Sequence, residues 1–442
     1  MSQTAVLTPQ QRNTARRAVI ASSMGNALEW FDIIVYASFA VVISKLFFPQ
    51  AGGVTALLFT FGAFATSYLI RPLGALVLGS YGDRSGRKAA LTLTIALMTL
   101  GTAIMAVAPT AATIGPAAGL VILVSRLLQG FSAGGEFGTA TTFLVENAPH
   151  RKAYYASWQV ATQGAAMLLA SVFGFTLNVF LSAEQLSSWG WRVPFFFGLL
   201  VGPVGLYIRL RMSETPEFAV AEKVKSPVAR TLVDHPGRVL SAAAATGLAS
   251  ISVYLILYMP TFAVTNLHLP RYAGFLGGII SGLVSLIGVP FVGKLADRLG
   301  PLRIMLVAAV VSLVLALPLF LVLVANPSVL VLTLVQVVLG VQMAFYFGPL
   351  PALLTFMYPT QIRTTGLAIS YNLGVTLFGG FAPIVLTALI SSSGSLLSPS
   401  YYFMAVAVVS IIGLLVIRSQ RYVDHSPAAT ATHLPRAGAG AS

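Results

Sequence analysis

Long apolar segments alternate with short polar ones along almost the whole chain. Reading from one polar, Gly-rich or Pro-rich break to the next gives twelve segments, namely 18–46, 54–80, 89–108, 118–147, 153–181, 191–211, 238–265, 271–296, 302–324, 328–357, 364–392 and 400–418. A run of about 20 apolar residues is long enough to cross a bilayer as a helix. The pattern therefore predicts an all-α integral membrane protein with twelve transmembrane helices.

Composition excludes most soluble classes. Of the 442 residues, 57% are hydrophobic and only 9% charged, whereas about a quarter of the residues in an ordinary soluble domain are charged. A soluble enzyme, a nucleic-acid binder and a disordered scaffold are therefore excluded. The chain also lacks a phosphate-binding loop and a Ser-His-Asp set, which argues against an ATP-driven pump and against an enzyme.

The residue types that hold metals and cofactors are scarce. The chain has no Cys, and its five His are scattered without a helical i,i+4 pair. We therefore expect no metal site and no cofactor. The net charge of +14 is spread between the apolar segments rather than gathered into one patch, so no nucleic-acid partner is expected.

The cations show which side of the membrane each loop occupies. With the N-terminus inside, 21 Lys and Arg fall on the inner side and three on the outer side. Positive charge in the inner loops sets membrane topology, so both termini are expected in the cytoplasm. No cleavable signal peptide is evident, because residues 1–17 are polar and the first apolar segment contains Glu29 and Asp32.

Two motifs recur at nearly the same distance. Gly79-Ser-Tyr-Gly-Asp83-Arg84-Ser-Gly-Arg87-Lys88 returns as Gly293-Lys-Leu-Ala-Asp297-Arg298-Leu-Gly300, with the two Asp 214 residues apart. Pro149-His-Arg151 returns as Pro359-Thr-Gln-Ile-Arg363, with the two Arg 212 residues apart. A duplicated unit predicts two pseudo-symmetric six-helix bundles, 18–211 and 238–418, with a linker at 212–237 and tails at 1–17 and 419–442.

The repeated loops suggest a latch on the cytoplasmic side. An Asp at a helix start is favoured by the unpaired N–H groups there, and the Arg residues can pair with neighbouring helix ends. The candidate gate residues are Asp83, Arg84, Arg87, Arg151, Asp297, Arg298 and Arg363. The alternative is that these residues only anchor topology and cap helices.

Charges inside the apolar segments carry the candidate chemistry, because an intramembrane charge is expensive unless it faces a cavity or a partner. Asn26, Glu29, Asp32 and Tyr36 trace one polar stripe of the first segment. Two carboxylates so close together disfavour simultaneous ionisation, so we expect Asp32 or Glu29 to carry a proton. The alternative is that both merely balance a buried Arg.

Arg126 is the first candidate for binding a substrate carboxylate, because a guanidinium binds a carboxylate bidentately and stays charged. The alternative is a structural ion pair with Glu29 or Asp32. Glu136 lies two turns beyond Gln129 on the same face and is a third candidate for proton coupling. For Arg71 a structural role is expected.

Three polar pairs lie on single helix faces or at similar depth. They are Gln159 with Gln163, Tyr254 with Tyr258, and Tyr371 with Asn372. Together with Asn26 and Tyr36 they are candidate substrate ligands. Each pair can equally join helices, a contribution of under about 1–2 kcal/mol.

The motifs resemble those of the major facilitator superfamily, and more narrowly of its metabolite:proton symporter family. The quoted residues are Gly25-Asn-Ala-Leu-Glu29-Trp30-Phe-Asp32, Arg71-Pro-Leu-Gly74, Arg126-Leu-Leu-Gln129-Gly130 and Trp189-Gly-Trp191-Arg192. Ser157-Trp158-Gln159 and Phe378-Gly-Gly-Phe381 resemble the bacterial citrate–proton and tricarballylate–proton symporters. Trp30, where citrate carriers have Gln, and Pro301-Leu302, where a basic pair is usual, depart from the pattern.

The resemblance implies a monomeric carrier of the bacterial inner membrane that works by alternating access. Its expected partners are a small organic-acid substrate, protons and the lipid bilayer. The expected activity is proton-coupled import of citrate, tricarballylate or a related di- or tricarboxylate. One alternative is a symporter of a zwitterionic osmolyte (proline or betaine), favoured by cation–π contacts from Trp30 and Phe31, or of 2-oxoglutarate or shikimate. Another is a sensor that does not transport, although no soluble signalling domain is present.

Overall fold

A computed structural model describes residues 26–85, 87–134, 136–146, 151–210, 227–359 and 362–423 of the chain. Every regular element in these ranges is helical. The expected tail 1–17 lies outside the described residues, the expected tail 419–442 is described only up to residue 423, and the expected linker 212–237 is described only from residue 227.

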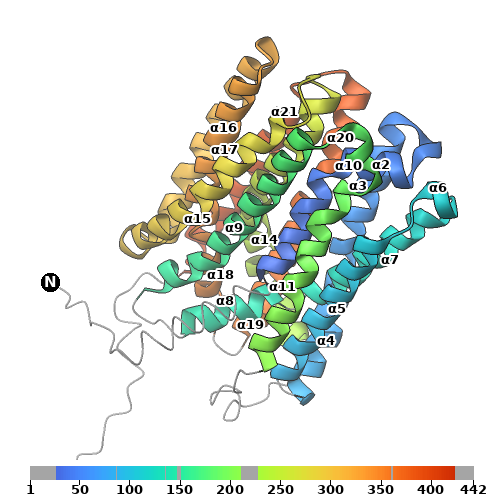
Figure 1. The fold of residues 1–442 in the computed structure, drawn as a ribbon. Coiled ribbons are helices and arrows are strands. Elements are labelled where there is room, and N and C mark those ends of the chain that lie inside the picture. The colour runs from blue at the N-terminus through green and yellow to red at the C-terminus, as the bar shows by residue number, and fades with distance from the viewer. Residues whose placement is uncertain are drawn as a thin grey trace, which may run out of the picture.

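The helices of residues 26–210, which we call the N-terminal helices, run from blue to green in Figure 1. They are the first helix (Asn26–Ser38), α2 (Ala40–Phe47), η1 (Pro49–Ala51), α3 (Gly53–Leu69), α4 (Arg71–Ser85), α5 (Arg87–Val107), α6 (Ala111–Ile114), α7 (Ala117–Ala133), α8 (Glu136–Glu146), α9 (Lys152–Phe180), α10 (Ala183–Ser188), η2 (Gly190–Arg192) and α11 (Val193–Leu210).

The helices of residues 227–423, the C-terminal helices, follow in yellow to red (Figure 1). They are α13 (Pro227–Asp234), α14 (Pro236–Thr265), α15 (Ala273–Leu299), α16 (Pro301–Ala325), α17 (Val329–Phe347), α18 (Leu350–Phe356), α19 (Arg363–Val375), η3 (Thr376–Gly380), α20 (Ala382–Ser393) and α21 (Ser398–Ser419).

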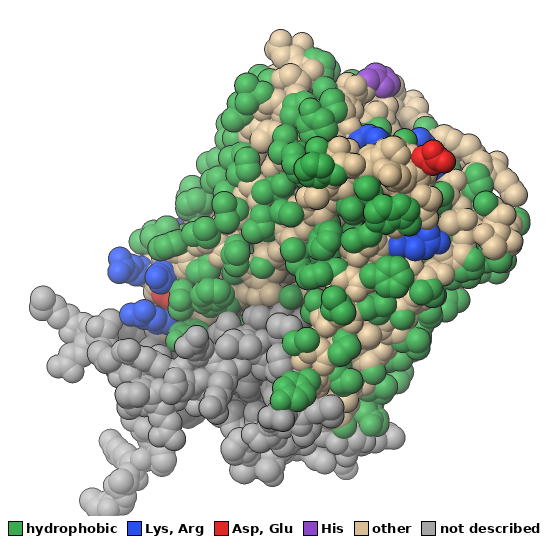
Figure 2. All heavy atoms as spheres, viewed as in Figure 1, with side chains coloured by type: hydrophobic (Ala, Val, Ile, Leu, Met, Phe, Trp, Pro, Cys, Tyr) green, Lys and Arg blue, Asp and Glu red, His purple; other side chains and the backbone are tan. Residues whose placement is uncertain are grey.

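The membrane-spanning pattern agrees with the sequence. Within the described ranges, nine helices are long and apolar enough to cross a bilayer, and the first helix and α2, bent by 68° relative to each other, make a tenth if they form one span. α5 and α11 lie at the positions of the other two expected spans. Large apolar side chains such as Leu76, Val314 and Leu330 are exposed on the outer surface, and Figure 2 shows such side chains over most of the visible face. A surface of this kind suits contact with lipid rather than water.

Glycines bring α9 and α15 together along their whole length. A side-chain carbon at Gly293 would meet Ser157 Oγ at 2.5 Å, one at Gly164 would meet Ser285 Cβ at 2.5 Å, and one at Gly174 would meet the Phe275 ring at 2.1 Å. The residue numbers rise on one helix as they fall on the other, so the two helices are antiparallel neighbours. Because α9 is N-terminal and α15 C-terminal, this contact joins the two sets of helices.

A second glycine surface places α7 against α3 and α4. A Cβ at Gly130 would lie 2.0 Å from the Ser67 carbonyl oxygen, and one at Gly134 would lie 2.1 Å from the Arg71 carbonyl oxygen. Only glycine allows this approach. It fixes which face of α7, including Arg126 and Gln129, points toward the first helix and α5.

The expected eleventh span contains a π-helical turn, η3, between α19 and α20. A Cβ at Gly379 would meet the Tyr254 ring at 2.5 Å, and one at Gly380 would meet the Tyr68 ring at 2.5 Å. Irregular turns of this type often occur at functional sites. Here the turn lets a C-terminal helix approach two tyrosines, one from each set of helices.

Candidate functional site

Asp32, on the first helix, is 1% exposed and faces α5 and α7. Its Oδ2 atom accepts hydrogen bonds from Thr102 Oγ1 and from Gln129 Nε2, the second at 2.8 Å. Its Oδ1 atom is buried and has no hydrogen-bond partner. The carboxyl group is therefore held through one oxygen, while the other is available to a proton.

Arg126, on α7, is 1% exposed. Its guanidinium carbon lies 4.3 Å from the centre of the Tyr36 ring, and Tyr36 donates a hydrogen bond to the Thr60 carbonyl oxygen at 2.9 Å. The Nε and Nη2 atoms of Arg126 have no hydrogen-bond partner. Among the described residues no carboxylate lies within 4 Å of it, so it is a buried cation without an ion pair.

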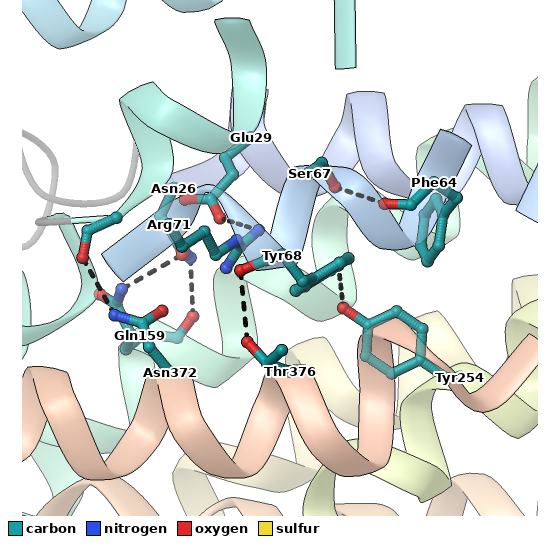
Figure 3. A network of polar contacts seen from close by, with 11 residues as sticks. Asn26, Glu29, Phe64, Ser67, Tyr68, Arg71, Gln159, Tyr254, Asn372 and Thr376 are labelled. Atoms are coloured by element: carbon teal, nitrogen blue, oxygen red, sulfur yellow. Dashed lines mark hydrogen bonds and ion pairs between the residues drawn. The ribbon is translucent and has the colours of Figure 1, made fainter. Parts of the chain in front are cut away.

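Glu29, one turn before Asp32, belongs to a different set of contacts. Its Oε1 atom forms an ion pair with Arg71 Nη2 at 2.9 Å, and both residues are at most 5% exposed. The Arg71 guanidinium also lies 4.2 Å from the centre of the Tyr68 ring. Figure 3 shows this pair within a network of polar contacts. The structural role expected for Arg71 agrees with this geometry.

The same network joins the two sets of helices. The hydroxyls of Tyr68 and Tyr254 are hydrogen-bonded to each other. Asn372 Nδ2 donates to the Gly134 carbonyl oxygen at 3.0 Å, and Thr376 Oγ1 donates to the Tyr68 carbonyl oxygen at 3.4 Å. In Figure 3 these side chains lie between the N-terminal and C-terminal helices. Tyr254 and Asn372, both predicted as substrate ligands, are thus used here to close the interface.

Asn26 and Gln159 bond to each other. Asn26 Nδ2 donates to the Gln159 carbonyl oxygen at 2.9 Å, and Gln159 Nε2 donates to Asn26 Oδ1 at 3.1 Å. The polar stripe predicted on the first helix is therefore divided among five neighbouring helices. Asn26 faces α9, Glu29 faces α4, and Asp32 and Tyr36 face α5, α3 and α7.

A narrow cavity lies on the opposite side of the first helix. It is lined by Trp30, Ile34, Val160, Gln163, Gly164, Met167, Val253, Met343 and Phe347. Both polar atoms of the Gln163 amide are buried, and neither forms a hydrogen bond with a residue that the structure describes. Gln163 is the predicted ligand that lines this cavity, whereas Asp32 and Arg126 do not line it. The cavity lies between N-terminal helices and the C-terminal helices α14 and α17.

The remaining predicted ligands are spread over the C-terminal helices. Tyr258 accepts a hydrogen bond from Thr387 Oγ1 at 3.1 Å. Tyr371 stacks on Phe137 with ring centres 3.5 Å apart, and its hydroxyl has no hydrogen-bond partner. Glu136, the third candidate for proton coupling, is 5% exposed at the start of α8.

Asp297 links the two sets of helices at the end of α15. Its Oδ1 accepts the Ala153 N–H at 2.8 Å and its Oδ2 accepts the Tyr154 N–H at 3.1 Å. These N–H groups belong to the first turn of α9, where a carboxylate is stabilised by the helix dipole. The sequence placed Asp297 at the start of a helix, but it lies in the last turn of α15 and its carboxylate caps a helix of the other set.

The other gate candidates are less informative. Arg363 donates from Nε to the Tyr358 carbonyl oxygen at 3.4 Å, and Arg151 and Arg298 are exposed. The side chains of Asp83, Arg84 and Arg87 lie outside the described residues.

Two contributors were missed by sequence reasoning. Thr102 bonds to Asp32, and Tyr68 bonds to Tyr254. Thr and Tyr are common in membrane segments, so their type gave no signal, whereas Trp30, which the sequence singled out for cation–π contacts, lines the cavity. Within the described ranges no cluster of three His, Cys, Asp or Glu that could hold a metal is found.

Comparisons with known proteins point to one family. A family model of the Major Facilitator Superfamily matches residues 27–374. A citrate-proton symporter of Klebsiella pneumoniae is 34% identical over 399 residues, which cover 89% of this chain and 90% of the relative. A proline/betaine transporter of Escherichia coli K12 is 34% identical, covering 90% and 82% of the two chains, and a shikimate transporter of the same strain is 31% identical, covering 92% and 95%.

Solved structures show the same fold. A D-xylose-proton symporter superposes with a TM-score of 0.74 at 17% sequence identity, covering 92% of this chain and 98% of that one. A proton:xylose symporter bound to 6-bromo-6-deoxy-D-glucose gives 0.77 at 14% identity, with coverage of 92% and 96%. The predicted all-α membrane fold of the major facilitator type is confirmed, and so is the resemblance to the family.

Proposed function

The chain belongs to the major facilitator superfamily, a family of multi-pass membrane transporters rather than enzymes, and from this premise we propose that it couples import of a small carboxylate to protons. Citrate, tricarballylate or a related di- or tricarboxylate is the proposed substrate. We place both termini in the cytoplasm because of the distribution of Lys and Arg. We also propose that the protein is a monomer of the bacterial inner membrane, in line with its similarity to bacterial symporters.

Arg126 is the observation that carries the proposal. Among the described residues, Arg126 has two nitrogens without a hydrogen-bond partner and no carboxylate within 4 Å, and a buried cation in such surroundings is costly to maintain. A substrate carboxylate would supply the missing anion and the planar pair of acceptors that a guanidinium prefers. Relatives of this chain include citrate-proton symporters, which supports a carboxylate as the anion.

Asp32 is the proposed proton carrier. Its free Oδ1 can take a proton without breaking either hydrogen bond to Oδ2. Asp32 and Arg126 lie within electrostatic range of each other. Protonation of Asp32 therefore removes the anion that competes with a substrate carboxylate for Arg126, and this links the two binding events.

Two bundles, 18–211 and 238–418, would move against each other in this mechanism. Asp297, which caps α9 from the other set of helices, is proposed as a cytoplasmic gate that opens during the cycle. Tyr68–Tyr254 and Asn372–Gly134 are proposed to break with it. Gln163 is proposed as a polar ligand within the cavity that Trp30 and Phe347 also line, which is separate from the surroundings of Arg126.

A zwitterionic osmolyte is a second candidate substrate. Trp30 and Phe347 line the cavity, Trp30 lies 6.3 Å from Tyr254 between ring centres, and aromatic faces attract quaternary ammonium groups. A proline/betaine transporter is as similar to this chain as the citrate-proton symporter. Competition between unlabelled citrate and betaine for uptake of each labelled compound separates the two candidates.

The test uses purified protein in liposomes with an imposed proton gradient. Labelled citrate should accumulate with the gradient, and Asp32→Asn should lose this accumulation while retaining citrate exchange between the two sides. Asp234→Asn, an exposed carboxylate in an ion pair with Arg230, is the matched control and should behave as wild type. Accumulation by Asp32→Asn against a gradient would remove Asp32 from proton coupling.

A further inference from the structure

The hydrogen bonds around Asp32 are asymmetric in a way that identifies two further residues. Thr102 on α5 and Gln129 on α7 both donate to Oδ2, and Gln129 Nε2 lies 3.2 Å from Thr102 Oγ1. All three side chains are at most 5% exposed. Three different helices therefore meet at one carboxylate oxygen.

Thr102 has a second acceptor within reach. Its Oγ1 atom lies 3.1 Å from the Met98 carbonyl oxygen, one turn earlier on α5. A hydroxyl has one hydrogen to donate and can rotate between acceptors. It can donate to Asp32 when the carboxylate is charged and to Met98 when the carboxyl group is neutral.

The space beside the other oxygen is limited by α11. A Cβ placed at Gly198 would lie 3.3 Å from Asp32 Oδ1 and 3.3 Å from Thr102 Cγ2. A contact this short requires the neighbours to move. Because Gly198 has no side chain, space remains beside Asp32 Oδ1.

Given the proposed role of Asp32, we propose that Thr102 and Gln129 are positioning residues that hold the carboxylate through Oδ2 and make Oδ1 the oxygen that takes the proton. The Thr102 hydroxyl turns from Asp32 toward Met98 when the proton binds. The Gln129 amide donates to Asp32 in both states and keeps the carboxyl group in place. We call Thr102 and Gln129 the clamp. The clamp thus adjusts to the charge of Asp32 without moving a helix.

Few other charges act on this site. α7 contributes Arg126, the first helix contributes Tyr36, and Glu29 is engaged with Arg71. In the described contacts, α5 and α11 present no ionisable group to Asp32. Changes at Thr102 or Gln129 therefore alter the hydrogen bonding of the carboxylate and leave the surrounding charges as they are.

The test measures the protonation of Asp32 directly. Infrared difference spectra of the full-length protein are recorded against pH, and the carboxylic-acid band of Asp32 is assigned by its loss in Asp32→Asn. Thr102→Val removes a donor that stabilises the charged form, so the proton is held more tightly. The midpoint should move upward by about one pH unit.

Several variants make the result specific. Thr102→Ser keeps the hydroxyl and should restore the wild-type midpoint. Thr246→Val removes a buried hydroxyl that donates within its own helix, to the Ala242 carbonyl oxygen, and should not move the midpoint. Gln129→Leu should shift it in the same direction as Thr102→Val, and provides the test if Thr102→Val does not fold.

The outcomes separate this inference from the proposed function. An Asp32 band that titrates at the same pH in Thr102→Val, Gln129→Leu and wild type overturns the clamp but leaves proton coupling by Asp32 intact. The absence of any titrating band from Asp32 in the wild type overturns both. A midpoint that rises in both variants and returns in Thr102→Ser supports the clamp.

Discussion

Arg71 and Arg126 are two equally buried arginines with different surroundings. They are 3% and 1% exposed, and each guanidinium lies over a tyrosine ring, at 4.2 and 4.3 Å from the ring centre. Arg71 has an ion pair with Glu29 at 2.9 Å. Arg126 has no carboxylate within 4 Å among the described residues.

The difference separates structure from chemistry. A paired buried charge has already been compensated for its loss of water, and disturbing it changes stability. An unpaired buried charge is still uncompensated, so the arrival of an anion or the loss of a nearby proton changes its free energy most. The first pattern is that of a structural link, and the second is that of a binding site.

The largest expected effect is on the Arg71 pair. Arg71→Gln leaves Glu29 charged and without its ion pair, and breaking one partner of a buried pair costs about 3–5 kcal/mol. The midpoint of thermal unfolding in detergent should fall strongly. The double variant Glu29→Gln/Arg71→Gln removes both charges and should regain most of the loss. If the double variant is no more stable than Arg71→Gln, the loss of stability does not come from the unpaired charge of Glu29.

The next effect is on Arg126 and concerns binding. Arg126→Ala should weaken citrate binding by about 2–5 kcal/mol, or more than about thirtyfold, because a desolvated charge partner is lost. Citrate protection against thermal unfolding and the rate of citrate exchange measure it. Stability without citrate should change little, since no ion pair is broken.

Lysine variants sharpen the same contrast. Arg126→Lys keeps the charge but loses the planar pair of donors, so binding should fall, whereas Arg71→Lys should retain exchange. If Arg126→Lys binds citrate as wild type does, Arg126 is not a carboxylate ligand. If Arg71→Lys is the variant that loses binding, the roles assigned to the two arginines are reversed.

The sequence predicted the helices and the family well because these depend on long patterns. An apolar segment of about 20 residues can be recognised without knowing which helices pack against it. The repeated Asp83 and Asp297 motifs indicated duplication. The position of Asp297 was predicted wrongly: the motif placed it at the start of a helix, whereas it lies in the last turn of α15 and meets the first turn of α9, a contact that depends on how the helices pack.

The partners of the polar side chains could not be predicted in the same way. A polar residue in a membrane segment signals that it needs a partner, but the partner depends on helix rotation. That rotation is set by close contacts such as Gly130 with Ser67 and Gly134 with Arg71. The bond between Asn26 and Gln159 therefore could not be predicted. Nor could the bond from Thr102 to Asp32, because threonine is common in membrane segments.

The smallest predicted effect concerns Asp297, an exposed carboxylate that is hydrogen-bonded to the first turn of α9. Asp297→Asn keeps the shape and loses the charge on the first turn of α9, an interaction worth about 0.3–1 kcal/mol. The two sets of helices should separate more often at this end.

The opening can be measured by thiol labelling, because the chain has no Cys. Ser157 is buried beside Gly293, so the labelling rate of Ser157→Cys reports the opening. That rate should rise about two- to fivefold in Asp297→Asn and stay unchanged in Asp234→Asn. Equal labelling in all three backgrounds would mean that the Asp297 cap does not hold this end closed, and that the gate depends on the uncharged contacts deeper in the interface.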